Sequence, residues 1–106
     1  MMFGTKIYFV YIIYNLLRRK IYIGFTSKLK TRILRHNRIL SSKKKSYTSK
    51  NSGKWILIHK EEYSSLKDTM KREKWLKSGI GRKFIHNNLE QWIKSAQPAD
   101  PPKADF

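Results

Sequence analysis

The chain has 106 residues, of which 24 are lysine or arginine and only seven are acidic, so its formal charge is +17. This length suits one compact domain, and so positive a charge indicates a polyanionic partner, of which nucleic acid is the commonest. The absence of cysteine excludes disulfides, zinc–thiolate sites and thiol nucleophiles, and is consistent with a cytoplasmic protein. The longest apolar run, residues 7–17, is too short for a membrane span and lacks a signal-peptide cleavage pattern.

The first half of the chain predicts a β-hairpin followed by a helix. Residues 7–14 are β-branched and aromatic throughout, which predicts a central strand covered on both faces. Residues 21–25 form a second predicted strand, in which Gly24 marks a bulge or a close approach. The pair Thr26–Ser27 offers an N-cap for a predicted helix over residues 28–40.

The second half predicts one more strand and two helices. Residues 55–63 have strand composition, and a capping box of Ser65 and Asp68 opens a helix that ends near 78–79. The last predicted helix covers residues 82–95. The element order β-β-α-β-α-α predicts an α+β fold, with a three-stranded antiparallel sheet packed by helices.

One domain is expected over residues 1–95. Residues 96–106 hold all three prolines of the chain and are expected to form a disordered tail. Between the first helix and the third strand lies a stretch rich in serine and lysine, with no acid, which suits either a solvated loop or an arm that contacts phosphates. Candidate nucleic-acid contacts there and on the preceding helix are Lys28, Arg35, Lys43, Lys44, Lys45 and Lys50.

Acids are scarce in the body of the chain, which argues against a two-metal nuclease built on several carboxylates. Glu73 stands out because apolar residues flank it at helical spacing and predict that it lies on an apolar stripe. These residues are Leu66, Met70, Leu76 and Ile80. A carboxylate on such a stripe must be paired, hydrogen-bonded or metal-bound. A buried glutamate–arginine ion pair is the simpler alternative to a metal site.

Four further residues are ordinary when each is taken alone. Arg32 and His36 stand four residues apart and share one helix face, which is usually just an exposed basic face. Tyr11 and Tyr22 lie on the two hairpin strands, where tyrosines mostly serve packing.

Together these residues resemble the signature of the GIY-YIG nuclease family, in its stand-alone single-domain branch. The second half of the signature is intact as Tyr22-Ile23-Gly24, whereas the first half, Phe9-Val10-Tyr11, keeps only its tyrosine. Arg32 follows Tyr22 by ten residues, His36 follows four later, and Glu73 stands at the place of the family's metal-binding glutamate. The resemblance covers roughly residues 6–94.

Two positions depart from the family pattern. Phe25 replaces a lysine of the excision-repair branch, which points away from that branch. The family's late asparagine matches either Asn87 or Asn88, and the sequence does not decide between them.

The resemblance implies a Mg²⁺-dependent (or Mn²⁺-dependent) endonuclease that hydrolyses phosphodiester bonds in DNA with low sequence specificity, in repair or recombination. It implies catalytic roles for Tyr11, Tyr22, Arg32, His36 and Glu73, with Glu73 as the metal ligand. It implies no membrane and no small-molecule cofactor beyond the metal, and leaves open whether the DNA is structured or branched. The alternatives are a non-catalytic basic nucleic-acid-binding module and an RNA nuclease on the same scaffold.

Overall fold

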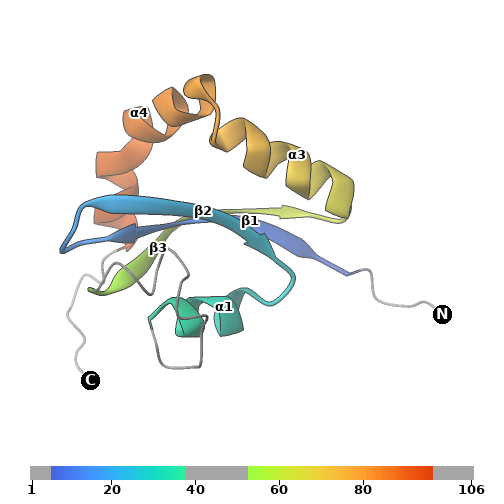
Figure 1. Ribbon diagram of the computed structural model, residues 1–106, viewed down its shortest axis with the longest axis horizontal. Coiled ribbons are helices and arrows are strands. Elements are labelled where there is room, and N and C mark those ends of the chain that lie inside the picture. Colours follow the sequence, from blue (N-terminus) through green and yellow to red (C-terminus); the bar gives the residue numbers. More distant parts are fainter. Residues whose placement is uncertain (1–5, 38–52, 97–106) are drawn as a thin grey trace.

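The computed structural model describes residues 6–37 and 53–96 (Figure 1). Their elements, in chain order, are β1 (Tyr8–Asn15), β2 (Lys20–Thr26), α1 (Leu29–His36), β3 (Trp55–Tyr63), α3 (Leu66–Leu76) and α4 (Gly79–Ala96). The predicted α+β class and the order β-β-α-β-α-α are confirmed. The predicted contacts Lys43, Lys44, Lys45 and Lys50 lie outside the described residues, as does the predicted tail except for Ala96, which ends α4. None of the helices in the described ranges has the length and apolar character that a membrane span requires.

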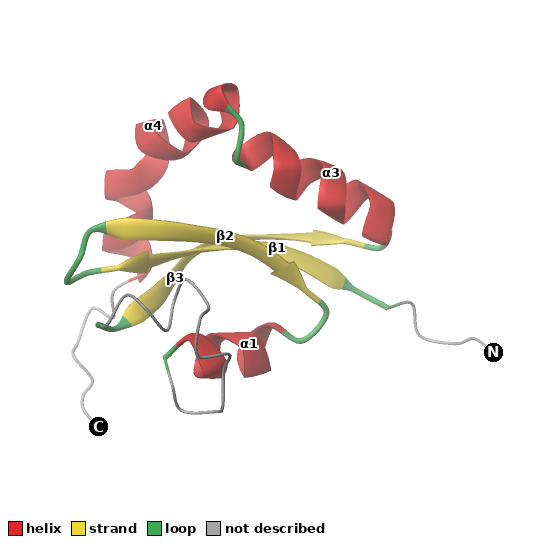
Figure 2. Cartoon of the chain, in the orientation of Figure 1, coloured by secondary structure: helices red, strands yellow, loops and turns green. Residues whose placement is uncertain are grey.

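The sheet is antiparallel with the strand order β2-β1-β3, so β1 is its central strand. Helix α1 lies on one face, and α3 and α4 cover the other (Figure 2). Residues Val10 to Ile13 have no exposed surface, which confirms the prediction of a central strand covered on both faces. Val10 and Ile12 join the core under α3 and α4, whereas Tyr11 and Ile13 join the core under α1.

The buried side chain of Asn15 closes the hairpin between β1 and β2. Its Oδ1 accepts hydrogen bonds from the backbone nitrogens of Leu17 (3.0 Å) and Arg18 (2.9 Å), a turn that asparagine favours. Arg19 completes the turn with a positive φ of 58°. The resulting register pairs Tyr11 with Gly24 and therefore places Tyr11 and Tyr22 on the same face of the sheet.

Helix α1 is shorter than the sequence predicts. It begins at Leu29, after the N-cap residue Lys28, whose side chain has no acceptor for a helix nitrogen. Thr26 Oγ1 accepts from the Lys28 nitrogen (3.0 Å), which precedes the helix. The prediction of a Thr26–Ser27 N-cap is therefore wrong. The helix ends at His36 with Asn37 as its C-cap, and residues 38–40 of the predicted helix lie outside the described residues.

The Asn37 side chain ties the end of α1 to the start of β3. Its Oδ1 accepts from the Trp55 nitrogen (2.7 Å), and its Nδ2 donates to the Trp55 carbonyl (2.9 Å). These two bonds imitate a strand pairing with Trp55, whose ring is buried in the core under α1. The clamp fixes α1, and with it His36, against the sheet.

Helices α3 and α4 are joined by a very short connection, residues 77–78. The predicted cap is confirmed, since Ser65 Oγ accepts from the Asp68 nitrogen (3.2 Å). The predicted stop at Ser78–Gly79 is only partly right, because Gly79 already starts α4, earlier than residue 82. Ser78 Oγ donates to the Trp75 carbonyl (2.6 Å) and accepts from the Gly81 nitrogen (3.2 Å). A Cβ at Gly81 would collide with the Trp75 carbonyl oxygen, so the close approach requires glycine.

A half-buried carboxylate attaches α3 to β3. Glu61 accepts two hydrogen bonds from the Arg72 guanidinium (2.8 and 3.0 Å) and one from the Tyr63 hydroxyl (2.7 Å), and His59 Nε2 lies 2.8 Å from its other oxygen. Burial tends to raise the pKa of Glu61, but the hydrogen bonds from Arg72, His59 and Tyr63 outweigh it and lower the pKa to about 2. The ionised form therefore stabilises the fold.

This depressed pKa predicts a loss of stability in acid. The contribution of Glu61 is fully present above its ordinary pKa of 4.5 and disappears as the pH falls towards 2. We expect Glu61→Gln to lower the free energy of unfolding by on the order of 2–3 kcal/mol at neutral pH, and the difference from wild type to shrink below pH 4.5. Denaturant unfolding at several pH values measures both, with Glu62→Gln as the exposed control. A difference that does not change with pH would contradict the assignment.

Candidate active site

Gly24 makes room for two tyrosines on the α1 face of the sheet. A Cβ at Gly24 would lie 2.7 Å from the Tyr11 hydroxyl oxygen and 2.9 Å from Cε2 of Tyr22. The predicted close approach at this glycine is therefore confirmed, with side chains rather than backbone as the neighbours. The two ring centroids are 6.2 Å apart. Within the Tyr22-Ile23-Gly24 triplet, Gly24 therefore leaves the space in which the Tyr22 ring packs.

His36 completes a three-ring cluster with the two tyrosines. Its Nε2 lies 2.8 Å from the Tyr11 hydroxyl, and its ring centroid is 4.9 Å from that of Tyr22. Burial, assisted by the charge of Arg32, lowers the pKa of His36 to about 4. The imidazole is therefore neutral at neutral pH and shares a hydrogen bond with the Tyr11 phenol.

The Tyr11 hydroxyl is the point on which the other candidate residues act. Burial raises its pKa most, the charge of Tyr22 raises it further, and the charge and hydrogen bond of Arg32 lower it. The charge of Glu73 also raises the pKa. Tyr11 consequently keeps its proton at any physiological pH. Tyr22, Arg32 and Glu73 come from β2, α1 and α3, and all three influence the pKa of this one phenol.

Glu73 faces inward from α3, as the sequence predicts, but the apolar stripe used to predict this is not the buried one. The buried residues of α3 are Thr69 and Leu76, which stand four residues before Glu73 and three after it. Three of the four apolar residues of the expected stripe are exposed: Leu66 (44%), Met70 (49%) and Ile80 (68%). The Glu73 side chain is 19% exposed and belongs to the Thr69–Leu76 face.

The sequence left two roles open for Glu73, a buried ion pair with arginine or a metal ligand. The ion pairs of α3 bear on this choice. The half-buried glutamate–arginine pair exists, but it joins Glu61 to Arg72. Glu73 instead accepts from Lys77 Nζ at 3.1 Å, one helical turn away and half-exposed. A pair with so exposed a lysine contributes little stability and exchanges readily. Sequence reasoning missed Glu61, because the partners His59 and Arg72 become neighbours only in the folded sheet.

Glu73 offers one carboxylate, rather than a cluster of ligands, to a divalent ion. In the described part of the chain, no group of three or more histidine, aspartate or glutamate side chains is placed to hold a metal. Mg²⁺ usually keeps several waters and takes one or two carboxylates together with phosphates of its substrate. Glu73 can supply such a carboxylate beside the tyrosines, provided that Lys77 gives it up.

Four remaining candidate residues lie away from this cluster or at its rim. Lys28 and Arg35 are exposed at the two ends of α1, on the sheet face that carries Tyr11 and Tyr22. Asn88 donates to the Phe84 carbonyl of its own helix (2.9 Å), and Asn87 lines a separate surface pocket of α4. Within the described residues, neither asparagine contacts the ring cluster.

A model of the GIY-YIG catalytic domain matches residues 7–84, which is most of the chain. The chain belongs to the GIY-YIG nuclease family. Comparisons with curated proteins and with solved structures give no match. The matched range includes both halves of the GIY-YIG signature, the arginine and histidine of α1, and Glu73.

The packing at Gly24 gives a test that does not require activity. Gly24→Ala should push the tyrosine rings apart and admit water, so the pKa of His36 should rise from about 4 towards 6.5. Imidazole titration followed by NMR measures this shift. Gly79→Ala is the matched control, since a Cβ there meets nothing within 4 Å. An unchanged His36 titration in Gly24→Ala would show that the glycine does not hold the rings in place.

Proposed function

We propose that this GIY-YIG protein is an endonuclease that hydrolyses phosphodiester bonds in DNA, with Mg²⁺ or Mn²⁺ as cofactor. The proposal is supported by the electrostatic influence of Tyr22, Arg32 and Glu73 on the buried Tyr11 hydroxyl, which lies 2.8 Å from His36 Nε2. Nucleases of this family act on DNA, and the charge of +17 suits that polyanion. A basic surface alone explains binding, but it gives no reason for a half-buried glutamate beside this cluster.

In the proposed mechanism, Tyr22 orients or deprotonates the attacking water. Its ring packs against Tyr11 and His36 but remains partly exposed, so solvent reaches it. A free phenol has a pKa of about 10, and a base at this position therefore needs nearby positive charge. Arg32, which already acts on the neighbouring Tyr11, supplies such charge. Tyr11 itself is the poorer base, since burial raises its pKa and keeps its proton in place.

Arg32 and Glu73 provide the electrostatic part of the mechanism. The planar guanidinium of Arg32 can grip two phosphate oxygens and stabilise the charge that builds up on them. Glu73 would hold the divalent ion, which when bound supplies Lewis-acid stabilisation of the leaving 3′ oxygen. The neutral Tyr11–His36 pair keeps Tyr22 in position and offers a hydrogen-bonded route for a proton.

Low sequence specificity follows from the kind of contacts available. The exposed cations Lys28 and Arg35 beside the site suit phosphate oxygens, and phosphate contacts position nucleic acid without reading its sequence. Incubation with a panel of labelled DNA and RNA structures, with and without Mg²⁺, tests the proposal directly. Cleavage of DNA only when the ion is present supports it, and binding without cleavage under all conditions favours the non-catalytic module.

Glu73 should be dispensable for binding and essential for cleavage. Glu73→Gln keeps the shape of the side chain but removes the metal ligand, so we expect cleavage to fall by about 10²-fold or more with little change in DNA affinity. Glu90→Gln is the matched control, because Glu90 also pairs with a lysine four residues later but lies on exposed α4 surface. Wild-type cleavage by Glu73→Gln would remove the metal assignment.

Tyr22 and Arg32 should act through single groups rather than through the fold. Tyr22→Phe deletes one oxygen and should reduce the cleavage rate by roughly 10²–10⁴-fold. Arg32→Lys should fail similarly, because an ammonium cannot reproduce the guanidinium fork. Tyr14→Phe is the control on the same hairpin, since Tyr14 packs against the opposite core. Single-turnover cleavage and thermal unfolding separate loss of chemistry from loss of folding, and full activity of Tyr22→Phe would contradict its role.

A further inference from the structure

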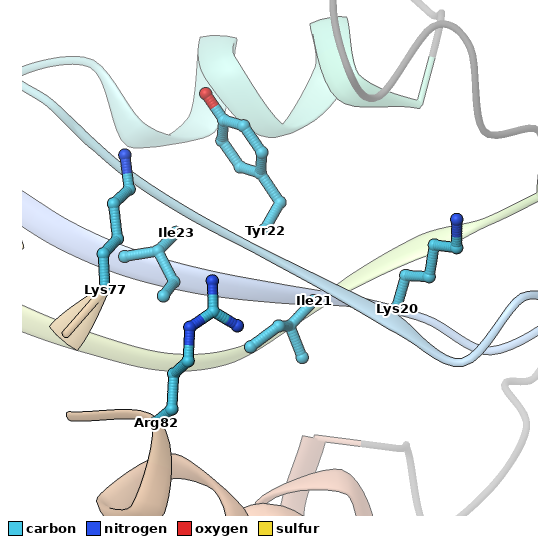
Figure 3. A pocket seen from close by; sticks show the side chains of 6 residues that line it. All are labelled: Lys20, Ile21, Tyr22, Ile23, Lys77 and Arg82. Carbon is cyan, nitrogen blue, oxygen red and sulfur yellow. The ribbon is translucent and has the colours of Figure 1, made fainter. Parts of the chain in front are cut away.

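A basic pocket of about 500 Å³ runs along the outer side of β2, next to the candidate active site (Figure 3). Strand β2 is an edge strand of the described sheet, so no other strand of that sheet covers this side. The lining residues come from β2, from the end of α3 and from the first turn of α4. They are Lys20, Ile21, Tyr22, Ile23, Lys77 and Arg82.

The pocket carries positive charge that the described acids do not neutralise. Lys20 and Arg82 are exposed, and neither forms an ion pair with a carboxylate of the described residues. Only Lys77 does so, with Glu73. The isoleucines Ile21 and Ile23 give the pocket an apolar floor between these cations, and Figure 3 shows the Arg82 guanidinium turned towards them.

The pocket joins the candidate active site through two of its own residues. Tyr22 lines the pocket and also contacts the His36 ring. Lys77 lines it and also binds the Glu73 carboxylate. Figure 3 shows the Tyr22 hydroxyl and the Lys77 ammonium extending to the same side of β2. A chain of phosphates that passes the site can therefore continue along β2, since none of the residues that line the pocket is acidic.

The backbone positions that carry two of the three cations are held at a fixed spacing. Lys77 ends α3 and Arg82 lies in the first turn of α4, across the junction that Ser78 and Gly81 keep closed. Cations on such a rigid junction recognise an anion at lower entropic cost than cations on long free chains do.

We infer that this pocket binds a backbone phosphate of the DNA strand, one that neighbours the phosphate to be cleaved. Arg82 would contact that phosphate from the α4 side of β2 and Lys20 from the opposite face of this edge strand, and Lys77 would bridge it to the active site. The neighbouring position rests on the proposed nuclease function, whereas the phosphate site itself rests on the pocket's charges. None of these three cations belongs to the nucleic-acid contacts that the sequence predicts.

DNA binding without metal tests the pocket apart from cleavage. Fluorescence anisotropy with a labelled DNA duplex in EDTA, at several salt concentrations, would compare wild type with Lys20→Gln/Arg82→Gln. The control Lys67→Gln/Lys83→Gln removes the same charge from exposed residues of α3 and α4 outside the pocket. The slope of log K against log salt should weaken by about 0.9 for each phosphate that the variant no longer neutralises, and affinity should fall roughly tenfold or more. The control should stay within about threefold of wild type.

Equal losses of affinity in the two double variants would overturn the inference, because only net charge would then matter. A duplex RNA of the same sequence that shows a larger pocket effect than DNA would overturn the assignment to DNA. Cleavage assays on the same preparations keep the two proposals distinct. A wild type that cuts, with normal binding by the pocket variant, refutes the pocket alone. A wild type that never cuts, with selective loss of binding in the pocket variant, refutes the nuclease alone.

Discussion

Strand β1 has helices on both of its faces, so every side chain between Val10 and Ile13 must fit a packed interior. Because side chains alternate along a strand, this constraint assigns Tyr11 to the α1 face and Val10 to the α3–α4 face without freedom for a slip. A buried phenol needs a hydrogen-bond partner for its hydroxyl group, and His36 on α1 is that partner for Tyr11. The burial of one strand thus fixes the helix that carries Arg32 and His36 above the hairpin that carries both tyrosines.

Two adjacent residues of α3 have different tasks: Arg72 attaches the helix to the rest of the fold, and Glu73 is a candidate site residue. Successive side chains on a helix point about 100° apart, so Arg72 and Glu73 face different neighbours. Arg72 is held by Glu61 on β3, and its guanidinium also lies over the rings of Trp75 (4.5 Å) and Phe84 (5.3 Å). Glu61 and Phe84 belong to other elements, so their contacts with Arg72 set the rotation of α3 about its axis. That rotation decides that Glu73 reaches the site rather than solvent.

Local signals predict the elements well, and packing between elements explains the rest. The strand 55–63 and the Ser65 cap follow from residues within a few positions of each other. The buried face of α3 does not, because Thr69 is polar and escapes a search for apolar periodicity. It is buried at little cost, since its hydroxyl donates to the Ser65 carbonyl (2.7 Å). The basic pocket cannot be predicted from the sequence for another reason. Lys20, Lys77 and Arg82 follow no regular spacing along the chain, and only the fold brings their three elements together.

The Asn37 clamp has a consequence for the length of the chain between α1 and β3. Because the Asn37 amide binds both backbone groups of Trp55, the two ends of residues 38–54 are pinned side by side whatever those residues do. Lengthening a segment whose ends already meet costs only about 0.6 kcal/mol per doubling. A change in the length of this connection therefore leaves the two bonds between Asn37 and Trp55 in place, so the attachment of α1 to β3 does not depend on it.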